Sequence, residues 1–229
     1  MTSHRILFSL LAYLTCYTSL YAEPQEISVR SMMLGKKEMP ELYFKTKSEE
    51  KLTPVNWSKR QPSKMVDALY EGTLPLFRME VNEDGENIPV VAHRVKVPSG
   101  AKEILLFGWK HKDKINLLAL GDNFLSAKHS DWFLINLSSK SIDFIVGRES
   151  KPIKVNSRQA IPYTIKVDED KGAAILGKAN IRNKDRIFYS SYIPVRSGRR
   201  TIIIFSDDGD KIRTTPVADL FSRRPKASE

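Results

Sequence analysis

Four short runs of β-branched and aromatic residues follow one another: 131–137 (Asp-Trp-Phe-Leu-Ile-Asn-Leu), 141–147 (Ser-Ile-Asp-Phe-Ile-Val-Gly), 152–155 (Pro-Ile-Lys-Val) and 161–167 (Ile-Pro-Tyr-Thr-Ile-Lys-Val). The segments between them, Ser-Ser-Lys, Gly-Arg-Glu-Ser-Lys and Asn-Ser-Arg-Gln, consist of residue types that turns select. This alternation of strand and turn predicts an antiparallel β-sandwich. No window of the mature chain keeps a helical apolar period beyond about two turns, so we expect an all-β protein.

The same pattern occurs earlier in the chain. A shift of 98 residues, applied to residues 57–107, gives nine identities over 51 positions, among them Val97 on Val195 and Phe107 on Phe205. Residues 97–107 and 195–205 both show a strand end, a Ser-Gly turn and a run of four apolar residues ending in Phe. Repeated order with matching turns indicates two copies of one structural plan.

Two further matches extend the repeat with other shifts. Residues 113–115 (Asp-Lys-Ile) match residues 210–212 at a shift of 97, and residues 42–44 match residues 133–135 at about 91. We therefore predict two tandem immunoglobulin-like sandwiches, an internal duplication with about seven strands in each copy. The first domain is expected at 26–122 and the second at 129–221.

The first 22 residues have the composition of an export signal. His4 and Arg5 give a positive start, residues 6–20 are largely apolar, and Ala22 is the small residue that signal peptidase accepts. We expect cleavage after Ala22 and a periplasmic or secreted mature chain without a transmembrane span. Cys16, the only cysteine, would leave with this segment. The alternatives are a lipoprotein signal acylated at Cys16 and an uncleaved membrane anchor.

The charge balance is strongly basic. The chain has 37 Lys and Arg against 27 Asp and Glu, a net charge of +10, and loss of Arg5 leaves +9. In an exported protein this charge favours an acidic envelope component, a glycan or a secreted protein as partner, and we expect no nucleic acid. Scattered basic residues also fit an ordinary solvated surface. Residues 222–229 are expected to be a disordered basic tail.

Hydrolase motifs are missing from the sequence. It contains neither His-Glu-x-x-His nor Gly-x-Ser-x-Gly, and the adjacent residues 129–131 (His-Ser-Asp) cannot converge as a triad. Residues 207–210 (Asp-Asp-Gly-Asp) and 82–87 (Asn-Glu-Asp-Gly-Glu-Asn) offer oxygen ligands to calcium, but Asx-Gly pairs between strands are typical of turns. We expect no catalytic residue, no metal and no cofactor.

Aromatic side chains give two open interpretations. Trp57, Trp109, Trp132 and Tyr192 lie in predicted strands, where they can pack in a core or form a platform for sugars. The best candidate for a surface contact is a strand end that runs into a basic hairpin loop, formed by Trp109, Lys110, His111 and Lys112.

The segment 131–138, followed by 142–147 and a strand after Asn156, resembles a recurrent pattern in uncharacterised exported bacterial β-sandwich proteins. In gross plan the chain is also similar to periplasmic pilus chaperones, which have an export signal, two immunoglobulin-like domains and a basic mature chain. That resemblance implies an arginine and a lysine between the domains that hold a client carboxylate, and Arg30 and Lys128 lie at suitable places. The chaperone motifs around them are absent.

These features together predict a non-catalytic exported protein that binds or assembles in the bacterial envelope. A periplasmic chaperone-like assembly factor is the first alternative. A carbohydrate-binding module or cryptic glycosidase is the second.

Overall fold

The computed structural model describes residues 24–35, 37–47, 52–111, 113–122, 130–147, 151–165, 172–195 and 200–219. These residues form sixteen strands and no helix, which confirms the all-β prediction. The predicted export signal, the tail at 222–229, Lys112 and Lys128 lie outside the described residues.

The first half contains eight strands in two sheets. They are β1 (Gln25–Met33), β2 (Tyr43–Lys45), β3 (Leu52–Pro54), β4 (Val66–Tyr70), β5 (Thr73–Val81), β6 (Asn87–Lys96), β7 (Glu103–His111) and β8 (Lys114–Gly121). Outer sheet 1 has the strand order β3-β2-β5-β6, and inner sheet 1 has the order β4-β1-β7-β8.

The second half also contains eight strands in two sheets. They are β9 (Ser130–Asn136), β10 (Ile142–Val146), β11 (Ile153–Val155), β12 (Gln159–Ile165), β13 (Gly172–Ile181), β14 (Lys184–Pro194), β15 (Arg200–Asp208) and β16 (Lys211–Asp219). Outer sheet 2 has the order β11-β10-β13-β14, and inner sheet 2 has the order β12-β9-β15-β16.

The two halves have the same strand order, which supports the predicted internal duplication. Adding eight to each strand number of the first half gives the two sheets of the second half. Details repeat as well. β1 pairs with β7 in parallel, as β9 does with β15, and the hairpins β5–β6 and β13–β14 each contain one register shift. Each copy has eight strands, one more than predicted.

The shift of 98 residues is wrong in β7, whereas the shift of 97 predicted for residues 113–115 holds for the whole β7–β8 hairpin. Ile104 pairs with Gly121 in β7–β8, and Thr201 pairs with Ala218 in β15–β16, so equivalent residues are 97 apart. Phe107 therefore corresponds to Ile204, and its identity with Phe205 is a coincidence of neighbouring apolar residues. A slip of one residue in a strand moves a side chain to the opposite face.

The match of residues 42–44 to 133–135 is also wrong. Residues 43–45 form β2 in outer sheet 1, whereas residues 133–135 lie in β9 of inner sheet 2. The counterpart of β2 is β10, where Ile142 and Phe144 are buried as Leu42 and Phe44 are. Both segments are short and apolar, and sequence alone does not separate an inner strand from an outer one.

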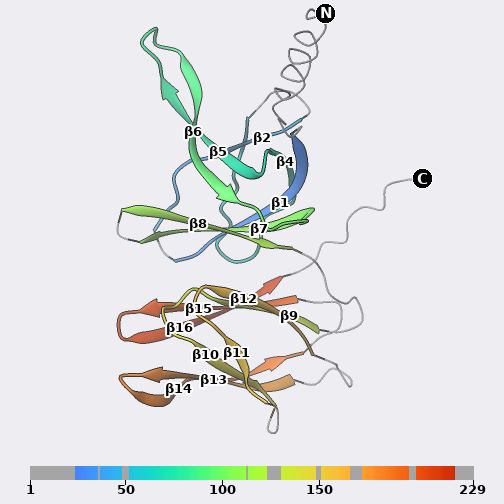
Figure 1. Cartoon of the computed structure of the whole chain (residues 1–229), viewed down its shortest axis with the longest axis vertical. Coiled ribbons are helices and arrows are strands. Elements are labelled where there is room, and N and C mark those ends of the chain that lie inside the picture. The colour runs from blue at the N-terminus through green and yellow to red at the C-terminus, as the bar shows by residue number, and fades with distance from the viewer. Residues whose placement is uncertain are drawn as a thin grey trace, which may run out of the picture.

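The four sheets stack as layers, with outer sheet 1 and outer sheet 2 at the ends of the molecule (Figure 1). Each sandwich has its own core, and a third cluster joins the two inner sheets. Its buried members are Met32, Leu105, Phe107, Phe133, Ile135, Ile202, Ile204 and Val217. We call this contact the inter-sandwich interface. The two halves thus pack on each other.

The interface explains the two runs of four apolar residues. In residues 104–107 and 202–205 every side chain is buried, and successive side chains face the sandwich core and the inter-sandwich interface in turn. An inner strand that is covered on both faces needs no polar alternation. These runs therefore mark β7 and β15 as central strands.

One position shows how the copies adjusted their packing. Gly108 of β7 is the counterpart of Phe205 of β15, which is fully buried in the second core. A Cβ atom added at Gly108 would lie 2.7 Å from Cζ3 of Trp57 and 2.7 Å from Cε of Met39. The ring of Trp57 thus packs directly against the backbone of Gly108. In the second copy the equivalent residue, Phe205, contributes its own ring to the core.

We expect Gly108→Ala to lower the free energy of unfolding by about 1–3 kcal/mol, because the new methyl group overlaps the Trp57 ring. Urea unfolding followed by tryptophan fluorescence measures this loss. Gly121→Ala, on the partner strand of the same hairpin, is the control, since an added Cβ meets nothing within 4 Å there. Equal stability of the two variants would contradict this packing.

Candidate functional site

Four charged side chains are buried at one end of the inter-sandwich interface. Arg30 of β1 binds Asp122, with Nε 2.6 Å from Oδ2, and Asp219 of β16, with Nη1 2.9 Å from Oδ1. Arg200 of β15 donates to the same two carboxylates. All four side chains are at most 9% exposed. We call this group the ion cluster. Its two positive and two negative charges balance.

The ion cluster combines both copies. Asp122 and Asp219 occupy equivalent positions, 97 residues apart at the end of the last strand of each copy. The two arginines have no such relation, because Arg30 corresponds to Phe133 and Arg200 corresponds to Glu103. The duplication thus brings two identical carboxylates together, and each copy supplies a cation from a different position.

The geometry fixes the charge state of this cluster. Burial opposes the charge of Arg30, but hydrogen bonds and attraction from Asp122 and Asp219 outweigh it and raise its pKa. Burial likewise opposes the charge of Asp122, but hydrogen bonds and attraction from Arg30 and Arg200 outweigh it and lower its pKa. The guanidinium group of Arg30 stays protonated and Asp122 stays ionised at neutral pH. The cluster is therefore a cross-link between the sandwiches.

Arg30 lies between the two sandwiches, where the chaperone resemblance places it. Its guanidinium group is occupied by Asp122 and Asp219, so a client carboxylate would have to displace one of them. Lys128, its expected partner, lies outside the described residues. The sequence did not single out Asp122 or Asp219. Their recurrence at a shift of 97 residues is the signal that marks them.

The basic strand end is only partly described. Trp109 and Lys110 are half-buried near the end of β7, and Trp109 packs against the inter-sandwich interface. His111 is the last residue of β7, and the structure describes no more of it than its backbone. Trp109 thus contributes to packing, and a contact role for Lys110 and His111 stays a prediction.

The other aromatic candidates divide between core and surface. Trp132 is buried in the second core and Trp57 packs against the first. Tyr192 of β14 is 65% exposed, and its hydroxyl accepts a hydrogen bond of 2.9 Å from the amide of Gly172. A Cβ atom at Gly172 would lie 2.0 Å from the Tyr192 ring, so the ring rests on that glycine. Tyr192 is the one of these four whose ring is strongly exposed.

The acidic segments are turns with internal partners. Asn82 Oδ1 accepts hydrogen bonds from the amides of Asp84 and Glu86, and Asp207 accepts one from the amide of Ser139. Within the described ranges, no three His, Cys, Asp or Glu side chains lie close enough together to hold a metal ion. In the same ranges, no helix is long and apolar enough to cross a membrane.

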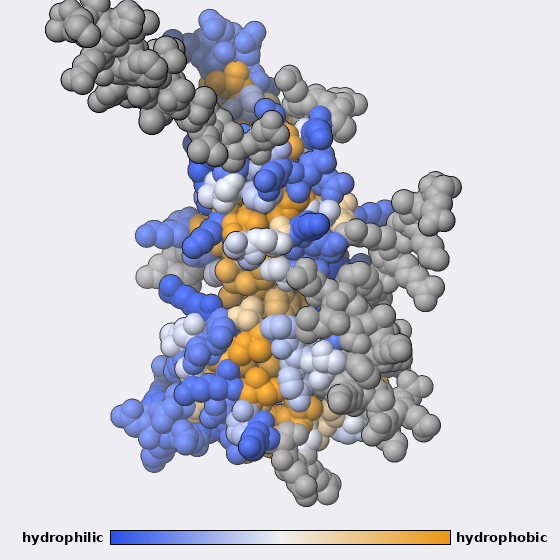
Figure 2. Space-filling view, turned by 45° about the vertical axis from the view of Figure 1, so that its right-hand side comes forward, coloured by the Kyte–Doolittle hydropathy of each residue, from blue (hydrophilic) through white to orange (hydrophobic). Residues whose placement is uncertain are grey.

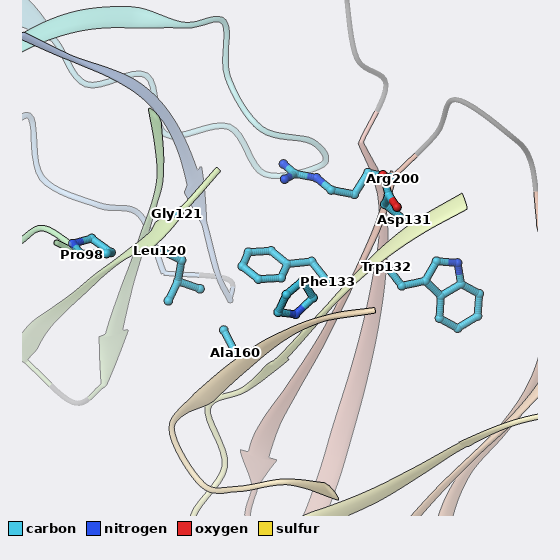
Figure 3. Close-up of a pocket in the computed structure, with 9 residues that line it drawn as sticks. Pro98, Leu120, Gly121, Asp131, Trp132, Phe133, Ala160 and Arg200 are labelled. Atoms are coloured by element: carbon cyan, nitrogen blue, oxygen red, sulfur yellow. The ribbon is translucent and has the colours of Figure 1, made fainter. Parts of the chain in front are cut away.

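A cavity of about 340 Å³ lies beside the ion cluster, between the halves (Figure 3). Leu120 of the first half and Phe133 of the second point into it, whereas Trp132 points away toward its own core. Its charged residues are already bonded: Arg200 binds the two aspartates, and Asp131 accepts a hydrogen bond from Thr164. The cavity is a gap in packing at the margin of the inter-sandwich interface.

The surface offers a different candidate at the two ends of the molecule. Six large apolar residues among those described are strongly exposed, and all six lie on the equivalent hairpins β5–β6 and β13–β14. They are Met79, Val81, Ile88, Val91, Ile187 and Tyr192. In Figure 1 the β5–β6 hairpin extends well beyond its sheet, and Figure 2 shows an orange patch among blue atoms at that end.

We name the distal parts of these hairpins arm 1 (residues 77–91) and arm 2 (residues 178–187). Each begins at the register shift of its hairpin, where an extra residue increases the local twist. On arm 1 the pairs Phe77–Val91 and Met79–Pro89 lie on one face with Val81. Alternate residues of a strand share a face, so one face of arm 1 is almost wholly apolar.

The comparisons with known proteins give no relative. Neither the protein-family models nor the curated proteins contain a match to this chain.

We expect Asp122→Asn to lower the free energy of unfolding at neutral pH by roughly 3–5 kcal/mol, because the two buried arginines then share the single carboxylate of Asp219. The loss should shrink in acid. The lowered pKa of Asp122 stabilises the folded protein above the ordinary value of about 3.9, and this contribution disappears as pH falls through the lowered folded pKa. Urea titrations between neutral and acid pH measure both effects.

Asp210→Asn is the matched control. Asp210 is 73% exposed and pairs with Arg182 at the surface, so its loss should change stability by less than about 1 kcal/mol. The structural role of the ion cluster would be contradicted if the two substitutions lowered the free energy of unfolding equally. It would also be contradicted if stability fell in acid in the same way with and without Asp122→Asn.

Proposed function

We propose that this chain is an exported, non-catalytic protein of the bacterial envelope that binds or assembles with partners through arm 1 and arm 2. The observation that supports this function most directly is the position of the exposed apolar side chains. All six of them, within the described residues, lie on two equivalent hairpins at opposite ends of the stack.

Exposed apolar groups on a folded protein mark places where another surface is bound. Val81 is 68% exposed and Ile187 is 59% exposed, although each of the two cores buries a dozen or more residues. The fold therefore buries many apolar side chains, but Val81 and Ile187 stay in contact with water. A binding role explains why the same hairpin is exposed in both copies.

The predicted export signal at 1–22 supports a periplasmic or extracellular location for this binding. Cleavage after Ala22 and the immunoglobulin-like type of the two sandwiches are predictions from the sequence. The basic net charge of the chain favours acidic partners in that compartment.

Glycan binding is a second candidate, and Tyr192 favours it. The ring is exposed, and contact with Gly172 and the hydrogen bond from its amide hold it in place, so little conformational entropy would be lost on stacking with a sugar. Glycan-array binding that Tyr192→Ala abolishes would establish this role over the proposed one.

Site-specific photocrosslinking tests the proposed function. A photoreactive residue placed at Val81 or at Ile187 should give discrete crosslinked products in whole cells, because both side chains would lie in a binding interface. The same residue at Lys154, an exposed position on β11 at the far edge of outer sheet 2, is the control.

Products from the arm positions alone would support the proposal. Equal labelling at Lys154, or no products from either arm, would contradict it. A hydrolytic activity of the pure protein that a single substitution removes would contradict the non-catalytic assignment.

A further inference from the structure

We propose that arm 1 of one copy of this protein docks on arm 2 of another, so that the chain assembles head to tail. This inference rests on the proposed function and names the partner of both arms as a second copy of the chain.

The charges of the two arms are complementary. Arm 1 carries one arginine, Arg78, against four carboxylates, Glu80, Glu83, Asp84 and Glu86, a net charge of −3. Arm 2 carries one carboxylate, Asp185, against four cations, Lys178, Arg182, Lys184 and Arg186, a net charge of +3. The acidic arm is the exception in a chain with a net charge of +10. Two copies of one hairpin have thus acquired opposite and equal charges.

One exposed apolar side chain is common to both arms. Val91 pairs with Phe77 directly after the register shift of hairpin β5–β6, and Ile187 pairs with Lys178 directly after that of hairpin β13–β14. Val91 and Ile187 are therefore equivalent residues, and both are exposed. An apolar centre flanked by opposite charges is the composition of a specific protein interface.

The arms cannot meet within one molecule. They belong to outer sheets 1 and 2, and both inner sheets lie between them (Figure 1). A contact between different surfaces of two copies is heterologous, and it leaves a complementary arm unoccupied on each copy. Assembly would therefore continue beyond a dimer.

The contact is made by side chains and does not extend a sheet. β6 and β14 are edge strands, but Pro89 of β6 has no amide hydrogen, and Lys184 and Arg186 on β14 oppose direct strand pairing. The ion pair of Arg78 with Glu80 lies within arm 1, and Arg182 of arm 2 pairs with Asp210 in the turn between β15 and β16. Both pairs are exposed and can exchange partners at little cost.

Charge reversal provides the test. Sedimentation velocity of the pure protein should show association that increases with protein concentration and weakens with added salt, because exposed charges are screened. The triple substitution Glu83→Lys, Asp84→Lys and Glu86→Lys on arm 1 should raise the Kd of association by at least about tenfold. The pair Lys184→Glu and Arg186→Glu on arm 2 should have the same effect.

A chain that carries both sets of substitutions exchanges the two signs, and it should associate again. A mixture of the two single-arm variants should associate as well, since each then offers the charge that the other needs. Glu38→Lys and Lys154→Glu, both at exposed positions away from the arms, are the controls and should leave association unchanged. Far-ultraviolet circular dichroism and thermal melts verify that each variant is folded.

A protein that stays monomeric at every concentration, or folded single-arm variants that associate as the unchanged chain does, would overturn this inference. Failure of the combined variant to associate would overturn it too. The photocrosslinks separate this result from the proposed function: products that contain a different protein uphold binding by the arms and refute a second copy as the partner, whereas no products refute both.

Discussion

The inter-sandwich interface is the contact on which the rest of the structure depends. The inner sheets are buried on both faces, because alternate side chains of β7 and β15 enter a sandwich core and the shared interface. At one end the ion cluster balances two arginines against two aspartates in a site closed to water. Apolar contact supplies the stabilisation, whereas the buried charges penalise any displacement that separates one ion from its partners.

Duplication and divergence are both visible in that interface. The strand order, the parallel pair and the register shift repeat in the two copies, so the plan of the fold was preserved. The side chains changed where the copies meet. Phe133 stands where the first copy has Arg30, and Trp57 covers Gly108 where the second copy has Phe205. The two arms diverged in charge in the same way, so the two ends of one molecule carry opposite net charges.

The sequence predicted the features that local patterns determine. Turn residues and β-branched runs predicted an all-β chain, and the Ser-Gly turns followed by four apolar residues predicted the repeat. The sequence placed the change of shift from 98 to 97 residues after Phe107, whereas the structure already has the shift of 97 at Ile104. Neighbouring apolar residues give the same identity score on either face of a strand. The sequence also missed the ion cluster, because Arg30, Asp122 and Asp219 are far apart in the chain and meet only after the sandwiches pack.

The two sandwiches keep a fixed relation to each other, which holds arm 1 and arm 2 apart and leaves both available. The most direct measurement is the distance distribution between spin labels on cysteines introduced at Lys45 of β2 and Lys154 of β11, exposed strand positions in the two outer sheets, in a Cys16→Ser background. The structure predicts one narrow distribution that persists at high salt. A broad distance distribution, or two populations, would show that the sandwiches move independently and would contradict a fixed inter-sandwich interface.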